Sequence, residues 1–167
     1  MEKVIQSYEY KLITDYYGEA KAKRSGVRYM NHIDEGLVIL KWIGASVEAM
    51  RAYCVHPIYQ GDSDLAYNHN NYKIDSNIMM LVMEYRSVAN EYLSKRHVYH
   101  LEDIRLSPLK DVNDMLIADK VQNYKDFEIY HKGKHERSNI LDQYFRNWLI
   151  TLGIEGDQYA EFVRRLK

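Results

Sequence analysis

The sequence has little cysteine and little proline, with one Cys and two Pro among 167 residues. The single cysteine, Cys54, excludes an internal disulfide framework and is compatible with a reducing compartment. The scarcity of proline favours helices, because proline interrupts the hydrogen bonds of a helix interior. No apolar run is long enough to cross a membrane, and the N-terminal segment lacks the apolar core of a signal peptide. We therefore expect a cytoplasmic protein without a membrane partner.

The chain also lacks an excess of either charge. Its 23 basic and 24 acidic residues give a net charge of −1 at pH 7. Proteins that bind nucleic acid or anionic membranes usually carry a basic field, so no nucleic-acid partner is indicated. The 46% hydrophobic and 28% charged content is typical of globular proteins. The length suits one domain over residues 1–167 with a sizeable core.

Apolar residues recur at three- and four-residue steps through most of the chain, and no segment alternates as a strand would. Glycines and capping residues divide this pattern, as where Gly44 ends one helix and Ser46 begins the next. We therefore predict an all-α fold, a compact single-domain bundle of six or seven helices. These span about 2–17, 30–42, 47–55, 76–93, 108–130, 139–152 and 158–166. Residues 59–65 are predicted to form a turn-rich acidic loop, and residues 66–73 show no period.

Two polar residues interrupt the apolar face of the predicted helix 108–130. This face is formed by Val112, Met115, Leu116, Asp119, Asn123 and Phe127. A carboxylate and an amide on a core-facing stripe are unfavourable unless a partner compensates them. Asp119 and Asn123 are therefore candidates for a ligand-binding or metal-binding site.

Two histidines occupy comparable positions on earlier helices. His32 lies on a core-facing stripe, and His56 ends a face of small residues. Pro57 disfavours helical dihedrals at His56, which places this residue at a helix C-terminus with its imidazole presented from the end. By contrast, His97 and His100 lack the spacing of a metal motif and are predicted to lie at the surface.

Three short motifs follow one another in the chain. They are Arg24-x-Gly26-x-x-Tyr29-x-Asn31-His32, then Ala52-x-x-x-His56, then Ala118-Asp119-Lys120-x-x-Asn123. Their order resembles the HD-domain phosphohydrolase superfamily, and within it the alarmone (RelA/SpoT-type) hydrolase branch. The resemblance covers roughly residues 20–130 and is most specific in the first and last motifs.

The resemblance implies an HD-domain type of helical bundle that hydrolyses a nucleotide or an alarmone-type substrate with a divalent metal. His32, His56 and Asp119 match three of the family's metal ligands, and the expected metal is manganese, zinc or iron. The residues expected to face the substrate are Arg24, Tyr29, Lys120 and Asn123. Arg24 belongs to a basic cluster, which is either a solvated loop or an electropositive rim for a phosphorylated ligand. This cluster is formed by Lys21, Lys23, Arg24 and Arg28.

The sequence departs from the family pattern after the second histidine. Pro57 stands where the family has the aspartate of its His-Asp pair. Gln60 and Gly61 stand where the family has an acidic pair that positions water. These departures bear on activity, because carboxylates neutralise the metal and orient water in such a hydrolysis. Asp62 and Asp64 are candidate substitute carboxylates, and Gln60 is the third candidate catalytic residue.

Three interpretations of the site are open at this point. The first is a metal-dependent phosphohydrolase whose metal site is variant and impaired. The second is a catalytically degenerate HD domain, with or without a metal, that binds a nucleotide or a protein partner without turnover. The third is a helical interaction protein in which the two histidines and Asp119 form a buried polar network. Its 16 tyrosines would then serve a protein partner or a homo-oligomer.

Overall fold

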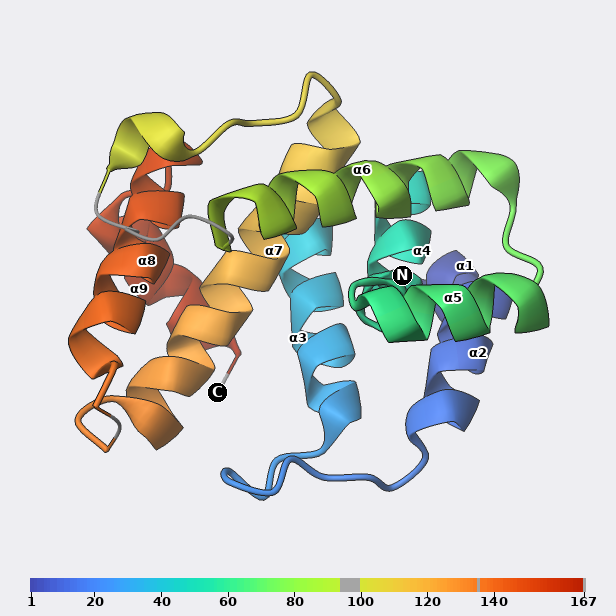
Figure 1. Cartoon of the computed structure of the whole chain (residues 1–167), viewed down its shortest axis with the longest axis horizontal. Coiled ribbons are helices and arrows are strands. Elements are labelled where there is room, and N and C mark those ends of the chain that lie inside the picture. Colours follow the sequence, from blue (N-terminus) through green and yellow to red (C-terminus); the bar gives the residue numbers. More distant parts are fainter. Residues whose placement is uncertain (94–99, 135, 167) are drawn as a thin grey trace.

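The computed structural model describes residues 1–93, 100–134 and 136–166, and the regular elements within them are helical (Figure 1). Within these described ranges there are nine α-helices, namely α1 (Glu2–Ile5), α2 (Tyr8–Tyr17), α3 (Tyr29–Trp42), α4 (Val47–Val55), α5 (Asp62–Asn71), α6 (Ser76–Leu93), α7 (Lys110–Asp126), α8 (Ser138–Thr151) and α9 (Gly156–Arg165). Two short 3-10 segments, η1 (His56–Tyr59) and η2 (Leu101–Asp103), and a π-helix, η3 (Phe127–His131), complete this set. None of the described helices is both long enough and apolar enough to span a membrane.

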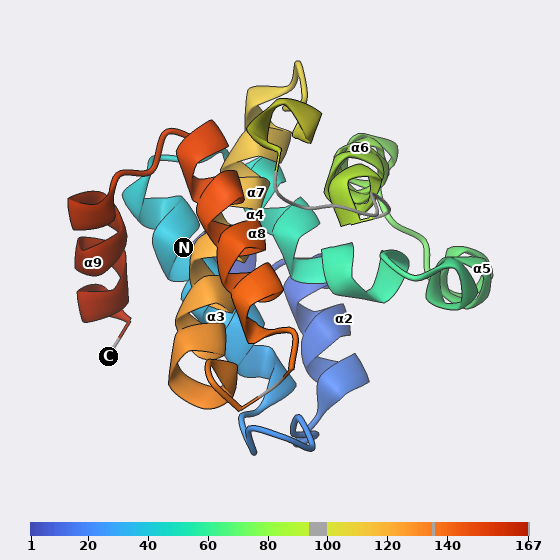
Figure 2. The same cartoon turned by 60° about the vertical axis from the view of Figure 1, so that its left-hand side comes forward.

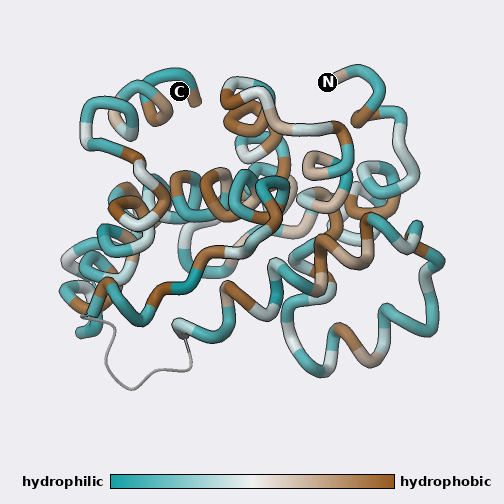
Figure 3. Tube along the Cα trace, turned by 90° about the horizontal axis from the view of Figure 1, so that it is seen from above, coloured by the Kyte–Doolittle hydropathy of each residue, from teal (hydrophilic) through white to brown (hydrophobic). Residues whose placement is uncertain are grey.

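Helix α7 runs through the middle of the molecule. It packs against α3, α4, α6, α8 and α9, while α5 and α9 lie at opposite outer edges (Figure 2). Hydrophobic and hydrophilic stretches alternate along the helices, as the trace in Figure 3 shows. Because α7 has neighbours on several sides, five of its polar residues are buried together with most of its apolar ones. Its buried polar residues are Asp114, Asp119, Lys120, Gln122 and Lys125.

The prediction of an all-α fold is confirmed, and several helix boundaries have the predicted cause. The Oγ of Ser46 accepts a hydrogen bond from the backbone N–H of Ala49 at 2.9 Å and caps α4. Gly44, between α3 and α4, has a φ of +72° that favours glycine. The Oδ1 of Asp75 accepts from the backbone N–H of Asn77 at 2.9 Å, directly before α6.

The number of helices differs from the prediction of six or seven for two local reasons. The predicted helix 2–17 is two helices, because Ser7 begins a second helix and its Oγ accepts from the backbone N–H of Tyr10 at 3.3 Å. The predicted acidic loop is wrong as well, since Asp62 and Asp64 form the first turn of α5. Acidic residues stabilise a helix N-terminus. The Nδ2 of the buried Asn68 attaches α5 through a 2.6 Å bond to the carbonyl oxygen of Ile58.

Other predictions shift by a few residues or lie outside the described part of the chain. Helix α7 begins at Lys110, two residues after Pro108, and its last turn continues as the π-helix η3. His100 is exposed, as predicted, whereas His97 lies outside the described residues.

The ring of Tyr53 on α4 lies directly against Gly36 of α3. A Cβ atom placed on Gly36 would overlap the ring of Tyr53, which is fully buried. This contact lies between the helix that carries His32 and the helix that His56 directly follows.

We predict that Gly36→Ala lowers the free energy of unfolding by about 2 kcal/mol or more, because an added methyl group overpacks this contact. Chemical denaturation of the full chain measures the change. Gly156→Ala is the matched control, since nothing lies within 4 Å of a Cβ placed there. Equal stability of the two variants would contradict the close approach at Gly36.

Candidate metal centre

His32, His56 and Asp119 come from three helices that pack on one another. His32 lies in the first turn of α3, His56 directly follows α4, and Asp119 lies in the middle of α7. The predicted place of His56 at a helix end is confirmed. The predicted loss of helical dihedrals there is wrong, because the chain continues into a 3-10 turn with φ −53° and ψ −37° at His56. Pro57 fits this turn as one of its first residues.

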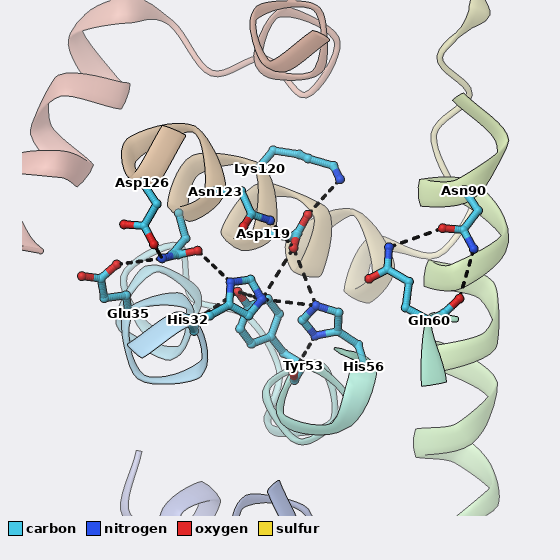
Figure 4. Close-up of polar contacts among 11 residues, drawn as sticks. His32, Glu35, Tyr53, His56, Gln60, Asn90, Asp119, Lys120, Asn123 and Asp126 are labelled. Atoms are coloured by element: carbon cyan, nitrogen blue, oxygen red, sulfur yellow. Dashed lines mark hydrogen bonds and ion pairs between the residues drawn. The ribbon is translucent and has the colours of Figure 1, made fainter. Parts of the chain in front are cut away.

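The donor atoms of these three residues converge (Figure 4). The Nε2 atoms of His32 and His56 are 3.4 Å apart, and each lies 3.6 Å from the Oδ1 of Asp119. A tetrahedral cation with bonds of about 2.1 Å separates its ligand atoms by about 3.4 Å. The spacing of the three donors therefore fits a divalent metal ion.

Each imidazole is fixed by a hydrogen bond from its other ring nitrogen. The Nδ1–H of His56 donates to the carbonyl oxygen of Tyr53, and the Nδ1–H of His32 donates to the Oε1 of Gln122, both at 2.7 Å. These bonds leave the Nε2 of each ring without a hydrogen, so that both lone pairs face the carboxylate oxygen. Three acceptors at this separation repel one another unless a cation lies between them. Burial lowers the pKa of His32, although Asp119 acts in the opposite direction. This lowered pKa disfavours protonation of the ring, so a proton is not the favoured cation between the three acceptors.

Aromatic rings enclose His56 on two sides. The ring of Tyr53 lies 4.6 Å from that of His56, and the ring of Tyr85 lies 4.7 Å away in an edge-on arrangement. The Tyr53 hydroxyl is 3.4 Å from the carbonyl oxygen of His32 and 3.3 Å from its Nε2. Since a hydroxyl has one proton, donation to the carbonyl leaves the Nε2 lone pair available for a metal.

Gln122 is a site residue that the sequence analysis missed. It is fully buried, and its Nε2 donates to Asp126 at 2.8 Å and to Glu35 at 3.1 Å. Two carboxylates on the amide nitrogen fix which end of the side chain faces His32. The Nζ of Lys125 forms ion pairs with both carboxylates, at 2.6 Å from the Oε2 of Glu35 and 2.9 Å from the Oδ1 of Asp126. The spacings His32-x-x-Glu35 and Gln122-x-x-x-Asp126 were the available sequence signal, since each pair shares a helix face.

Asp119 is compensated by neighbours on its own helix. Its Oδ2 lies 2.8 Å from the Nζ of Lys120, and its Oδ1 accepts from the Nδ2 of Asn123 at 2.8 Å. Burial by itself raises the pKa of a carboxyl group. Here Lys120 and the two imidazoles outweigh that effect, and the pKa of Asp119 is held well below its usual value. The carboxylate is therefore charged and available as a ligand.

Lys120, which we expected to face phosphates, is not among the described residues that line the cavity next to the three donor atoms. Its side chain is 4% exposed, with its Nζ 5.1 Å from the ring centre of Trp148 and 5.6 Å from that of Tyr144. The ion pair with Asp119 and the aromatic rings of α8 provide the stabilisation that a buried ammonium requires. Asp119 outweighs the effect of burial and raises the pKa of Lys120.

A cavity of about 710 Å³ opens next to the three donor atoms. Of the predicted site residues it is lined by Arg24, Tyr29, His32, His56, Gln60, Asp119 and Asn123. The basic cluster lies in the loop between α2 and α3, where Lys21 and Arg28 form an isolated bridge. Lys23 and Arg24, at the turn of this loop, and Arg28 line the cavity. Three residues of the basic cluster thus form one rim of the cavity, and all four remain exposed to solvent.

The other walls of the cavity are aromatic. Tyr17 and Tyr29, with ring centres 5.3 Å apart, lie on one wall. Phe127 and Phe145, 5.7 Å apart, lie on another, and His131 also lines the cavity. Phe127 and His131 are the first and last residues of the π-helix η3, and π-helical turns are frequent at functional sites. The sequence analysis missed His131 and Phe145, which carried no spacing relative to the histidines.

The two candidate substitute carboxylates, Asp62 and Asp64, are not among the described residues that line this cavity. Both are exposed on α5, and Asp62 forms an ion pair with Arg86. The formation of α5 in place of a loop explains why neither carboxylate approaches the donors. Gln60 does line the cavity, and its Nε2 donates to the Oδ1 of Asn90 at 3.4 Å.

The structure thus brings together the three predicted metal ligands, a basic rim and aromatic walls in one cavity. It separates Lys120, Asp62 and Asp64 from that cavity. Comparison of the chain with models of protein families, with curated proteins and with solved structures gives no match. The reasoning about function therefore rests on the motifs of this sequence and on the geometry of the cavity.

Proposed function

We propose that this chain is an HD-domain-like, metal-dependent phosphohydrolase that acts on a phosphorylated, nucleotide-like substrate. One observation carries the proposal: two Nε2 lone pairs and one carboxylate oxygen converge at 3.4–3.6 Å on the wall of a cavity with a basic rim. Catalytic metal sites commonly use three protein ligands and keep a further position for substrate or water, whereas structural sites are closed by four.

In this proposal, different residues of the chain bind the metal, the phosphate group and the apolar part of the ligand. His32, His56 and Asp119 hold the metal, which when bound supplies Lewis-acid activation of the phosphoryl group and of water. Lys23 and Arg24 bind the phosphate oxygens from the rim. The aromatic walls accept the apolar part of the ligand and exclude water from it.

Asp126 is the remaining carboxylate that can orient water in the cavity. Among the described residues that line the cavity, Asp119 and Asp126 are the only acidic ones. The Oδ2 of Asp126 accepts from Gln122, and its Oδ1 lies 2.9 Å from the Nζ of Lys125. These contacts fix the Asp126 carboxylate in position. We assign to it the role that Asp62 and Asp64 cannot perform from α5.

The second candidate function is binding without turnover, and a specific observation favours it. Pro57 lines the cavity where a fourth, anionic ligand would be expected, and Asp62 and Asp64 lie outside the cavity. A site with these replacements can retain a phosphorylated ligand through its metal and its basic rim. The two functions share the metal and differ in the release of phosphate.

We predict that the purified chain retains about one divalent metal ion, because three donors with fixed orientation form one site. Elemental analysis after dialysis measures the metal content. His32→Gln should lose the metal, whereas His69→Gln, on the exposed side of α5, should retain it. If the chain holds no metal after incubation with manganese, zinc or iron, both functions above are wrong in their metal-dependent form.

We predict phosphate release from at least one member of a panel of nucleoside mono-, di- and polyphosphates in the presence of Mn²⁺. His32→Gln should abolish the release, because the metal provides the activation. Phosphate assay and chromatography of the products measure it. A panel member that binds to the metal-loaded chain without any product would contradict hydrolysis of that ligand and support the second function.

We predict that Gln122→Leu weakens Mn²⁺ binding by about 10- to 100-fold, because partners that orient a ligand imidazole contribute that much to metal affinity. The variant removes the acceptor for the Nδ1–H of His32 and keeps most of the side-chain volume. Calorimetry measures affinity, and thermal unfolding of the metal-free variant controls for stability. Gln158→Leu, at an exposed position of α9, is the matched control. An unchanged Mn²⁺ affinity in Gln122→Leu would show that Gln122 does not position His32.

A further inference from the structure

The charge around the three donor atoms is close to neutral before any metal binds. Imidazole ligands are neutral, and the single charge of Asp119 is matched by Lys120, whose Nζ lies 2.8 Å from Oδ2. Glu35, Asp126 and Lys125 together carry one further negative charge, but the Gln122 amide separates them from His32. A divalent cation on the donors therefore keeps most of its charge uncompensated by the protein.

The coordination sphere is also incomplete on its protein side. Within the described ranges, no fourth His, Cys, Asp or Glu joins the three donors. Pro57, which directly follows His56, lines the cavity without offering a donor there. The direction left open is the cavity itself.

The basic rim gives this open direction a preference for anions. Lys23 and Arg24 line the cavity, and in the part of the chain that the structure describes no ion pair neutralises either of them. Arg28 is partly neutralised by Glu19 at 3.1 Å. Phosphate is the anion that suits both a divalent metal and a guanidinium group.

We propose that the phosphate group of the ligand supplies the missing anionic metal ligand, so that the divalent cation and the phosphorylated ligand bind cooperatively. Lys120 is the residue that creates this dependence, because it cancels the charge of Asp119 from a buried position outside the cavity. The inference rests on the proposed function in assigning metal and ligand to this cavity. By linkage, each partner raises the affinity of the other by the same factor.

The test is a binding cycle on the full chain with Mn²⁺ and inorganic phosphate as probes. Calorimetry measures the Kd for Mn²⁺ in chloride and in phosphate at equal ionic strength, and the Kd for phosphate with and without Mn²⁺. The association of Mn²⁺ with phosphate in buffer is measured separately and subtracted. We expect each Kd to fall by about tenfold or more when the other partner is present, within the usual range of coupling between sites.

The outcomes separate this inference from the function on which it rests. Mn²⁺ affinity that is equal in chloride and in phosphate overturns the cooperative binding and leaves the metal site intact. No Mn²⁺ binding in either buffer overturns both the inference and the metal-dependent function.

Variants of Lys120 test whether its charge is the cause. Lys120→Met keeps an unbranched side chain against Trp148 and Tyr144, and should tighten Mn²⁺ binding in chloride by about tenfold or more, since a nearby positive charge is lost. The difference between the Mn²⁺ affinities of this variant in chloride and in phosphate should be smaller than in the parent chain. Lys120→Arg should keep the behaviour of the parent chain. Lys110→Met, which removes an exposed lysine paired with Asp114 on the same helix, is the matched control.

An Lys120→Met chain that folds and shows unchanged Mn²⁺ affinity in chloride would overturn the role of Lys120. Its folding is checked by circular dichroism and thermal unfolding. If this variant does not fold, the binding cycle on the parent chain still decides whether metal and phosphate bind cooperatively.

Discussion

The buried ion pair between Asp119 and Lys120 is the interaction on which the rest of the site depends. Both residues lie in the middle of α7, and each is about 4% exposed. Removing one partner of such a pair typically costs about 3–5 kcal/mol, because the other charge remains buried. The pair explains why aromatic residues of α8 surround the Lys120 ammonium and why imidazoles of α3 and α4 approach the Asp119 carboxylate.

The contact between α3, α4 and α7 is consequently polar at its centre, although apolar side chains surround it. Hydrogen bonds to Tyr53 and Gln122 direct the lone pairs of both imidazoles toward Asp119. A cation that joins these atoms links three helices, so its binding free energy adds to the stability of the fold. The absence of a side chain at Gly36 leaves room for the Tyr53 ring, whose hydroxyl contacts the carbonyl oxygen of His32.

Periodicity predicted most helices and showed that Asp119 lies on an otherwise apolar helix face. Both results follow from the pattern of buried side chains. It did not predict α5, whose buried attachment is the polar Asn68 rather than an apolar stripe. The resemblance led us to expect Lys120 to face the substrate, but burial on several sides of α7 depends on helices that are distant in sequence. The resemblance to the HD-domain motifs predicted that His32, His56 and Asp119 belong to one site. It provided no information on Gln122, whose role depends on carboxylates from two helices.

In the proposed function, Asp126 is the residue that decides whether the site hydrolyses a phosphorylated ligand or only binds it. Asp62 and Asp64 lie on α5, which leaves Asp126 as the carboxylate in the described part of the cavity that is not one of the three candidate metal ligands. Both of its oxygens already have partners, Gln122 and Lys125. The bond to Gln122 also fixes the orientation of His32. In the proposed function one carboxylate thus has two roles, to position the Gln122 amide that orients His32 and to orient water. This sharing would favour ligand retention and slow turnover.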